Sequence, residues 1–205
     1  MKALIISAGR LSDAAFYRDV LSDISLVVCA DGGVRNCEAL GLVPDVVIGD
    51  FDSCPKNLAK AETVIELPTE KDRTDTHECV CYCIARGCTE ILLIGGIGTR
   101  LDHTLANIHL LAIAKASGVE MKIVDEHNEI FLIENEAEIP KKEGYHLSLL
   151  PIGSAEGIDA GGLYYPLENA RMEFGNPYGV SNEFTEETAW VSVKKGRLLA
   201  ILSKD

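Results

Sequence analysis

Two aspartates separated by one residue, Asp50 and Asp52, form the sequence pattern with the clearest chemical meaning. They follow the apolar run 46–48, which is typical of a buried strand, and open α/β sheets bind ligands at the carboxyl ends of their strands. Crowded carboxylates resist full ionisation unless a cation joins them, and Mg²⁺ is commonly held by carboxylates together with substrate phosphates. The pair therefore favours a magnesium site; from these residues alone, a solvated turn with aspartate caps is the alternative.

A second loop, Asp31-Gly32-Gly33, follows the apolar run 25–30 and precedes an expected helix. Glycines let the backbone approach a phosphate or ribose closely, and a helix N-terminus favours an anion. Asp31 could accept hydrogen bonds from ribose hydroxyls. A tight turn with a helix cap explains the same residues equally well.

A third loop, 69–75, carries charged residues just before an expected helix. Lys71 and Arg73 could meet phosphate oxygens, and Asp75 is a candidate third metal carboxylate. Asp75 would also lie in the first helical turn, where its charge suits the helix dipole. Helix stabilisation alone is the competing interpretation.

The fourth loop, 95–103, places Gly95, Gly96 and Gly98 between an apolar strand and a helix, as in a loop that cradles phosphate. Arg100 could clamp phosphate oxygens, and Asp102 and His103 are candidate acid/base groups. The dinucleotide fingerprint is missing its last glycine, and no P-loop occurs. The convergence of four such loops on one sheet edge favours a nucleotide–Mg²⁺ site.

The elements that must position these loops alternate between strand and helix patterns up to about residue 125, which predicts a mostly parallel, Rossmann-like sheet flanked by helices. Beyond that point short β runs are punctuated by glycine and proline, as in a small antiparallel sandwich. We therefore expect an α/β domain over 1–125, a linker over 126–143 and a β-sandwich over 144–205. Lys195-Gly196 is expected to form a hairpin turn, and Trp190 to be a core residue.

The formal charge of −13 disfavours non-specific nucleic-acid binding, which needs a basic footprint. Seven cysteines without a Cys-x-x-Cys pattern indicate reduced thiols in a cytoplasmic protein rather than a zinc site. No apolar run approaches the length of a membrane span, and the N-terminus lacks a signal-peptide pattern.

Taken together, the motifs resemble the thiamine pyrophosphokinase family. The resemblance rests on Asp31-Gly32-Gly33, the stretch 44–53, Lys71-Asp72-x-Thr74-Asp75, Gly95-Gly96 with Arg100-x-Asp102-His103, Gly162-Leu163-x-Tyr165-Pro166-Leu167 and Ser181-Asn182-Glu183-Phe184. It implies a homodimer that transfers the pyrophosphoryl group of ATP to the thiamine hydroxyl, giving thiamine diphosphate and AMP.

The resemblance also implies roles for individual residues. Asp50, Asp52 and Asp75 would surround Mg²⁺, with Lys71, Arg100 and Asp102 in the catalytic set. The nucleotide would contact Asp31, Gly32, Gly33, Ser53, Asp72, Thr74, Gly95, Gly96, Gly98 and His103. Thiamine would lie between subunits against Tyr165, Ser181 and Asn182. A different Mg²⁺-dependent transferase or phosphohydrolase, or a catalytically silent nucleotide or thiamine sensor, is the alternative.

Overall fold

The computed structural model describes residues 1–52 and 60–205, which divide into two compact units, Met1–Glu126 and His127–Asp205. The fold is mixed α/β, with extensive β-sheet and few helices. Ser53, an expected nucleotide contact, lies outside the described residues. None of the helices in the described ranges is long and apolar enough to cross a membrane.

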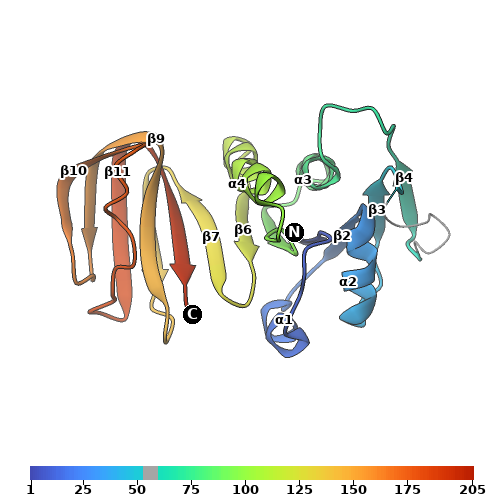
Figure 1. Ribbon diagram of the computed structural model, residues 1–205, viewed down its shortest axis with the longest axis horizontal. Helices are drawn as coiled ribbons and strands as arrows, with labels where there is room; N and C mark the ends of the chain where they lie inside the picture. Colours follow the sequence, from blue (N-terminus) through green and yellow to red (C-terminus); the bar gives the residue numbers. More distant parts are fainter. Residues whose placement is uncertain (53–59) are drawn as a thin grey trace. The chain divides into compact units, whose positions relative to one another are not determined.

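The first unit contains a parallel sheet with the strand order β4-β3-β2-β1-β5-β6 (Figure 1). Its strands are β1 (Lys2–Ile6), β2 (Leu26–Ala30), β3 (Val46–Gly49), β4 (Thr63–Glu66), β5 (Glu90–Ile94) and β6 (Glu120–Val124). The chain moves outward in one direction from β1 to β4 and then returns to the other side of β1 to form β5. This reversal between β1 and β5 is where parallel α/β sheets open a crevice for ligands.

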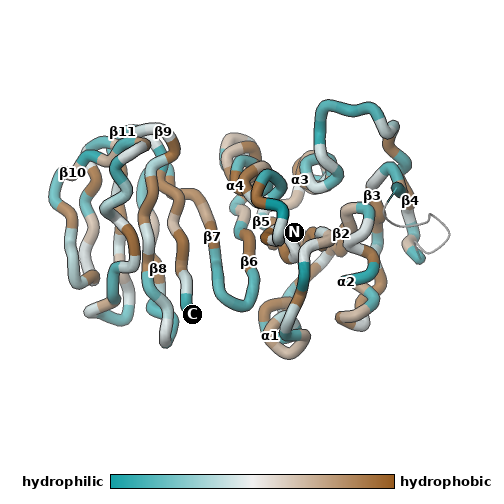
Figure 2. Tube along the Cα trace, viewed as in Figure 1, coloured by the Kyte–Doolittle hydropathy of each residue, from teal (hydrophilic) through white to brown (hydrophobic). Residues whose placement is uncertain are grey.

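Helices connect these strands: α1 (Ala14–Val20), α2 (Val34–Ala39), α3 (Asp75–Ala85) and α4 (Leu101–Ala116), with a 3-10 turn, η1 (Asp31–Gly33), before α2. Leu4 and Ile6 of β1 pack with Tyr17 of α1 and Cys37 of α2 in one core cluster. The intervening Ala3 and Ile5 are also fully buried. Because successive strand residues face opposite sides, both faces of β1 are covered, and its residues 3–6 are all apolar. Figure 2 shows hydrophobic stretches in the other strands of this unit, such as β5.

Side-chain hydrogen bonds hold the start of α1 in place. Asp13 is the N-cap, and its carboxylate accepts hydrogen bonds from the backbone N–H groups of Ala15 and Phe16. The backbone N–H groups of Ser12 and Asp13 instead donate to the carboxylate of Glu126. Tyr17 also donates to Glu126, at 2.9 Å, so the end of the first unit is tied to α1.

The second unit is an antiparallel sheet in which β11 pairs with β9, β7 and β8, and β10 pairs with β9. The strands are β7 (Asn128–Ile133), β8 (Glu136–Pro140), β9 (His146–Gly161), β10 (Leu167–Glu173) and β11 (Thr188–Ser203). The segment 126–143, expected to be a linker, therefore contributes two strands. Its acidic residues alternate with apolar ones in β8, so that Ile139 is buried between exposed neighbours.

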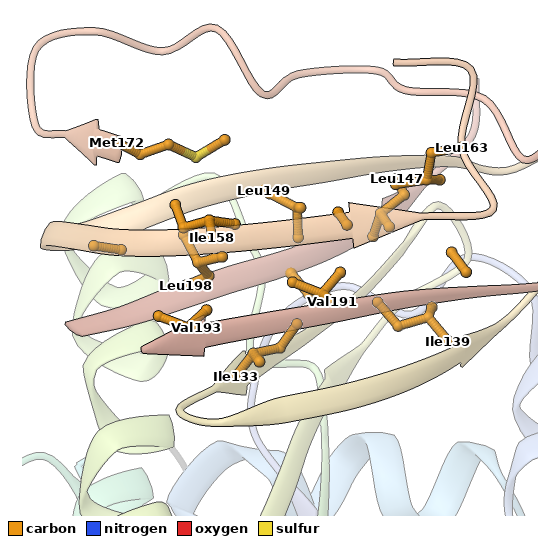
Figure 3. Packing of buried hydrophobic residues seen from close by; sticks show 14 of the residues in the cluster. Ile133, Ile139, Leu147, Leu149, Ile158, Leu163, Met172, Val191, Val193 and Leu198 are labelled. Atoms are coloured by element: carbon orange, nitrogen blue, oxygen red, sulfur yellow. The ribbon is translucent and has the colours of Figure 1, made fainter. Parts of the chain in front are cut away.

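Two further expectations for this unit are wrong. Lys195-Gly196 forms no hairpin turn, because β11 runs through it; Gly196 has φ +90°, and the pairing with β9 shifts register there, as in a β-bulge. Trp190 is 48 % exposed rather than buried, since its neighbours Ala189 and Val191 take the core-facing positions. Figure 3 shows this core, formed by side chains such as Ile133, Leu149 and Met172.

Candidate functional site

A cavity of about 500 Å³ lies in the first unit at the carboxyl ends of β1, β2 and β5, at the reversal in strand order. Loops from three of the four predicted motifs meet there. The predicted residues that line it are Asp31, Gly32, Lys71, Arg73, Thr74, Asp75, Gly95, Gly96, Gly98, Arg100 and His103. The lining set does not contain Gly33, Asp50, Asp52, Asp72 or Asp102.

The loop after β3 holds its two aspartates in a constrained turn. Phe51, between them, has φ +62°, a left-handed conformation that is costly for a residue other than glycine. The backbone N–H of Asp52 donates to Oδ1 of Asp50 at 3.3 Å, which holds the Asp50 carboxylate against the turn. Strained backbone of this kind clusters at functional sites.

A third carboxylate joins this pair, and it belongs to Asp31. One carboxylate oxygen from each of Asp31, Asp50 and Asp52 lies within 4.8 Å of the others. Asp31 is only 6 % exposed, and its Oδ1 has no hydrogen-bond partner within residues 1–52 and 60–205. A buried, unpaired carboxylate oxygen is costly unless a ligand satisfies it, so this all-oxygen donor set fits a hard cation such as Mg²⁺.

Asp75, predicted as the third metal carboxylate, contacts Lys71, which also contacts Asp50. The Nζ atom of Lys71 lies 3.0 Å from Oδ1 of Asp75 and donates to Oδ2 of Asp50 at 2.7 Å. Burial raises the pKa of the Asp75 carboxyl, whereas the hydrogen bond from Lys71 lowers the pKa of Asp50. Burial opposes the positive charge of Lys71, but the two carboxylates outweigh it and raise the pKa of this ammonium group.

Helix α3 brings Asp75 to this place. Thr74 is its N-cap, and the Thr74 hydroxyl accepts a hydrogen bond from the backbone N–H of His77 at 3.2 Å. Thr74 therefore has a structural role that is sufficient to explain its presence. Asp72 is exposed in the loop before it.

Arg100, which lines the cavity, forms an ion pair with Asp102. The Nη2 atom of Arg100 lies 2.6 Å from Oδ2 of Asp102, and both side chains are well exposed. The hydrogen bond from Arg100 lowers the pKa of the Asp102 carboxyl. Asp102 is therefore an ionised group whose position is set by the guanidinium beside it.

Four polar residues that the sequence patterns did not single out support the cavity walls. The hydroxyl groups of Ser7 and Thr76 lie 2.8 Å apart, linking the end of β1 to α3. The Asn36 amide donates to the carbonyl oxygens of Ser7 and Gly9, at 2.8 and 2.7 Å. Asn107, buried in α4, donates to the carbonyl of Gly96 at 2.7 Å. Ser7 could have been identified from its place directly after β1.

The three residues expected to meet thiamine lie together in the second unit. The side-chain amide of Asn182 accepts from the backbone N–H of Tyr165 at 3.0 Å and donates to its carbonyl at 2.8 Å. The backbone N–H of Ser181 donates to the hydroxyl of Ser148 at 3.0 Å. The Tyr165 ring is 67 % exposed and meets that of Tyr164 edge to face, with centroids 4.9 Å apart. Its backbone is therefore held while its ring remains accessible.

Comparison with known proteins identifies the family of both units. Residues 17–123 match the family model described as thiamin pyrophosphokinase, catalytic domain, and residues 134–198 match thiamin pyrophosphokinase, vitamin B1 binding domain. A thiamine pyrophosphokinase of Bacillus subtilis is 28 % identical over 217 residues, covering the whole of both chains, and thiamine pyrophosphokinase 1 of Oryza sativa subsp. japonica is 28 % identical, covering 82 % of this chain and 75 % of its own.

Solved structures show the same likeness. The crystal structure of the Bacillus subtilis thiamine pyrophosphokinase superposes with a TM-score of 0.90 at 27 % identity, covering the whole of both chains. A thiamin pyrophosphokinase family protein from Enterococcus faecalis gives a TM-score of 0.85 at 27 % identity, also over both whole chains. With its two family domains in order and a cavity lined by the expected motifs, this chain belongs to the thiamin pyrophosphokinase family.

Proposed function

We propose that this chain transfers the pyrophosphoryl group of ATP to the hydroxyl of thiamine, forming thiamine diphosphate and AMP. Family membership supports the reaction. The main observation in favour of this site for the reaction is the cavity at the reversal between β1 and β5, with a carboxylate cluster beside it. A cavity of about 500 Å³ is within the usual size range of a small-molecule site.

Asp31, Asp50 and Asp52 would hold Mg²⁺, with Asp75 as a neighbouring carboxylate. Bound there with the phosphates, Mg²⁺ would supply charge neutralisation for the transferred group. Within the described residues, Oδ1 of Asp31 is buried and has no hydrogen-bond partner, which supports Asp31 as one of the metal ligands. The expectation that Asp75 ligates the metal directly remains a proposal, since its nearest cationic partner is Lys71.

The phosphates of ATP would lie along the cavity wall formed by Gly95 and Gly96, with Lys71 and Arg100 as cationic contacts. In the reaction, the thiamine oxygen forms a bond to the β-phosphorus while the bond from that phosphorus to the AMP oxygen breaks. Asp102 would orient the hydroxyl or take its proton. Most of the acceleration would come from positioning and charge neutralisation.

Thiamine would bind at Tyr165, Ser181 and Asn182. Thiamine is cationic and flat, and an exposed tyrosine ring offers stacking and cation–π attraction. We further propose a cytoplasmic homodimer in which the thiamine site lies between subunits. The six cysteines in the described part of the chain are free, which suits a reducing compartment.

We also propose finer fold assignments. The parallel strand order of the first unit supports a Rossmann-like classification. The two long strands β9 and β11 and their shared core support a β-sandwich in the second unit. Figure 3 is consistent with this, because side chains from β7 and β8 and from β9 and β10 point toward a common interior.

The decisive experiment incubates the purified full chain with ATP, thiamine and MgCl₂ and quantifies all products. Equal amounts of AMP and thiamine diphosphate are expected. Formation of ADP or phosphate instead would favour a different Mg²⁺-dependent transferase or phosphohydrolase, and binding without any product would favour a sensor.

A further inference from the structure

Asp50 occupies a position shared by two groups of charges. Its carboxylate is one of the three in the candidate metal cluster, and it also accepts the hydrogen bond of Lys71. Its two oxygens are both engaged: Oδ1 accepts from the backbone N–H of Asp52, and Oδ2 accepts from Lys71. A cation approaching this cluster therefore meets an ammonium group already paired with one of its ligands.

The ammonium group is enclosed rather than loosely placed. The side chains of Lys71 and Asp50 are 15 % and 11 % exposed, and Asp75 flanks the ammonium at 3.0 Å. In such a partly desolvated setting, like charges repel more strongly than they do in water. With Lys71 in this position, a divalent cation at the cluster would bind against that repulsion.

Lys71 also lines the nucleotide cavity, so an alternative anionic partner can reach it. A lysine side chain is flexible and carries three rotatable donors, which suits a change of partner. The triphosphate of ATP would present anionic oxygens to the same ammonium group. Once the ammonium pairs with phosphate, the carboxylate of Asp50 is released toward the cluster.

We propose that Lys71 acts as a resident counter-cation that changes partner from Asp50 to a nucleotide phosphate, so that the divalent cation binds well only together with the nucleotide. This inference rests on the proposed function, because it requires the cluster to hold a metal and the cavity to hold ATP. It assigns Lys71 a second role beyond phosphate binding, namely selection against the bare cation.

The test measures Mn²⁺ binding to the full chain by electron paramagnetic resonance, first without nucleotide. Lys71→Met removes the ammonium and should tighten Mn²⁺ binding by about tenfold or more. Lys71→Arg keeps the charge and should bind bare Mn²⁺ as weakly as the wild type. Lys60→Met removes the same charge from an exposed lysine paired with Glu38, and it controls for net charge.

The measurement is then repeated with an ATP analogue whose α- and β-phosphates are joined by a methylene group. With the analogue bound, Lys71→Met should no longer bind Mn²⁺ more tightly than the wild type, and it could bind Mn²⁺ more weakly. The reason is that the wild-type lysine now helps to bind the phosphates. Equal or weaker binding of bare Mn²⁺ by a folded Lys71→Met protein would overturn the inference. So would a failure of wild type and variant alike to bind Mn²⁺ with or without the analogue.

Product formation by the wild type is measured in parallel. If it makes AMP and thiamine diphosphate while Lys71→Met gains no Mn²⁺ affinity, only the counter-cation role is wrong. If it makes neither product, the proposed function fails and this inference fails with it.

Discussion

Gly49 and Asp31 approach each other so closely that a Cβ atom on Gly49 would lie 2.7 Å from the Cβ atom of Asp31. A side chain at Gly49 therefore cannot be accommodated without moving Asp31. The contact joins the end of β3 to the turn after β2, and both loops supply carboxylates to the candidate metal cluster. Gly49 thus lets the cluster form, although it offers no ligand of its own.

We predict that Gly49→Ala weakens Mn²⁺ binding in the presence of the ATP analogue by about tenfold or more, as expected for loss of a group that positions a metal ligand. Asp31→Asn should have a similar effect. Because both changes act on the same carboxylate, the double variant should be little worse than either single variant. Fully additive losses would show that Gly49 acts independently of Asp31.

The carboxylates of Asp50 and Asp52 should each be essential for turnover. Asp50→Asn and Asp52→Asn are expected to lower kcat by about 10²-fold or more, because each removes charge from the cluster that neutralises the transferred group. Steady-state formation of thiamine diphosphate measures the effect. Glu120→Gln, an exposed change at the opposite end of the sheet, is the control. Near-normal turnover of either Asp variant would remove that residue from the site.

Asp102→Asn tests the proposed proton acceptor and should lower kcat by about 10²-fold or more. Because Arg100 lowers the pKa of the Asp102 carboxyl, Asp102 remains ionised at pH values where an ordinary aspartate would already be protonated. Activity that depends on it should be lost only as pH falls through that lowered pKa. Unchanged turnover in Asp102→Asn would leave Asp102 solely as the partner of Arg100.

Tyr165→Ala should raise the KM for thiamine by about tenfold, because it removes a stacking and cation–π surface, while the KM for ATP stays unchanged. Tyr165→Trp should retain affinity. Phe174→Ala serves as a control, since Phe174 is an exposed aromatic residue in another loop of the second unit. A change in the KM for ATP alone would contradict the placement of thiamine at Tyr165.

The hydrogen bonds to Glu126 should stabilise the first unit. Tyr17→Phe is expected to lower the free energy of unfolding by about 1 kcal/mol, and Glu126→Gln by about 2 kcal/mol, since a charged acceptor makes stronger hydrogen bonds. Denaturant titration measures both. Tyr82→Phe is the control, because Tyr82 packs near Arg86 through its ring.

The effect of Glu126 should depend on pH. Burial raises the pKa of its carboxyl, but the hydrogen bonds from its own backbone, Asp13, Ser12 and Tyr17 outweigh burial and lower it below the ordinary 4.5. Its stabilising contribution is therefore present above pH 4.5 and lost as pH falls through the lowered pKa. The difference between wild type and Glu126→Gln should shrink over that range; a constant difference would contradict the charged role of Glu126.

Periodic patterns were sufficient to predict most elements of the first unit. A short apolar run such as that in β5 indicates a buried strand. The loops after β2, β3 and β5 could be predicted to lie near one another, because the carboxyl ends of parallel strands meet at one edge of the sheet. In the second unit the same patterns led to a wrong prediction of a hairpin turn at Lys195-Gly196, where β11 continues as one strand. A glycine with positive φ occurs both in hairpin turns and in β-bulges. Only the pairing of β11 with β9 shows that Gly196 belongs to a bulge.

By itself, the sequence determined the family, the order of the domains and the chemical types gathered at the site, because these depend on local patterns and motifs. The tertiary structure decided which carboxylates meet: Asp31 joins Asp50 and Asp52, while Asp75 pairs with Lys71. These contacts span residues far apart in the chain. Their distances are set by the packing of strands and helices, which no spacing along the sequence expresses.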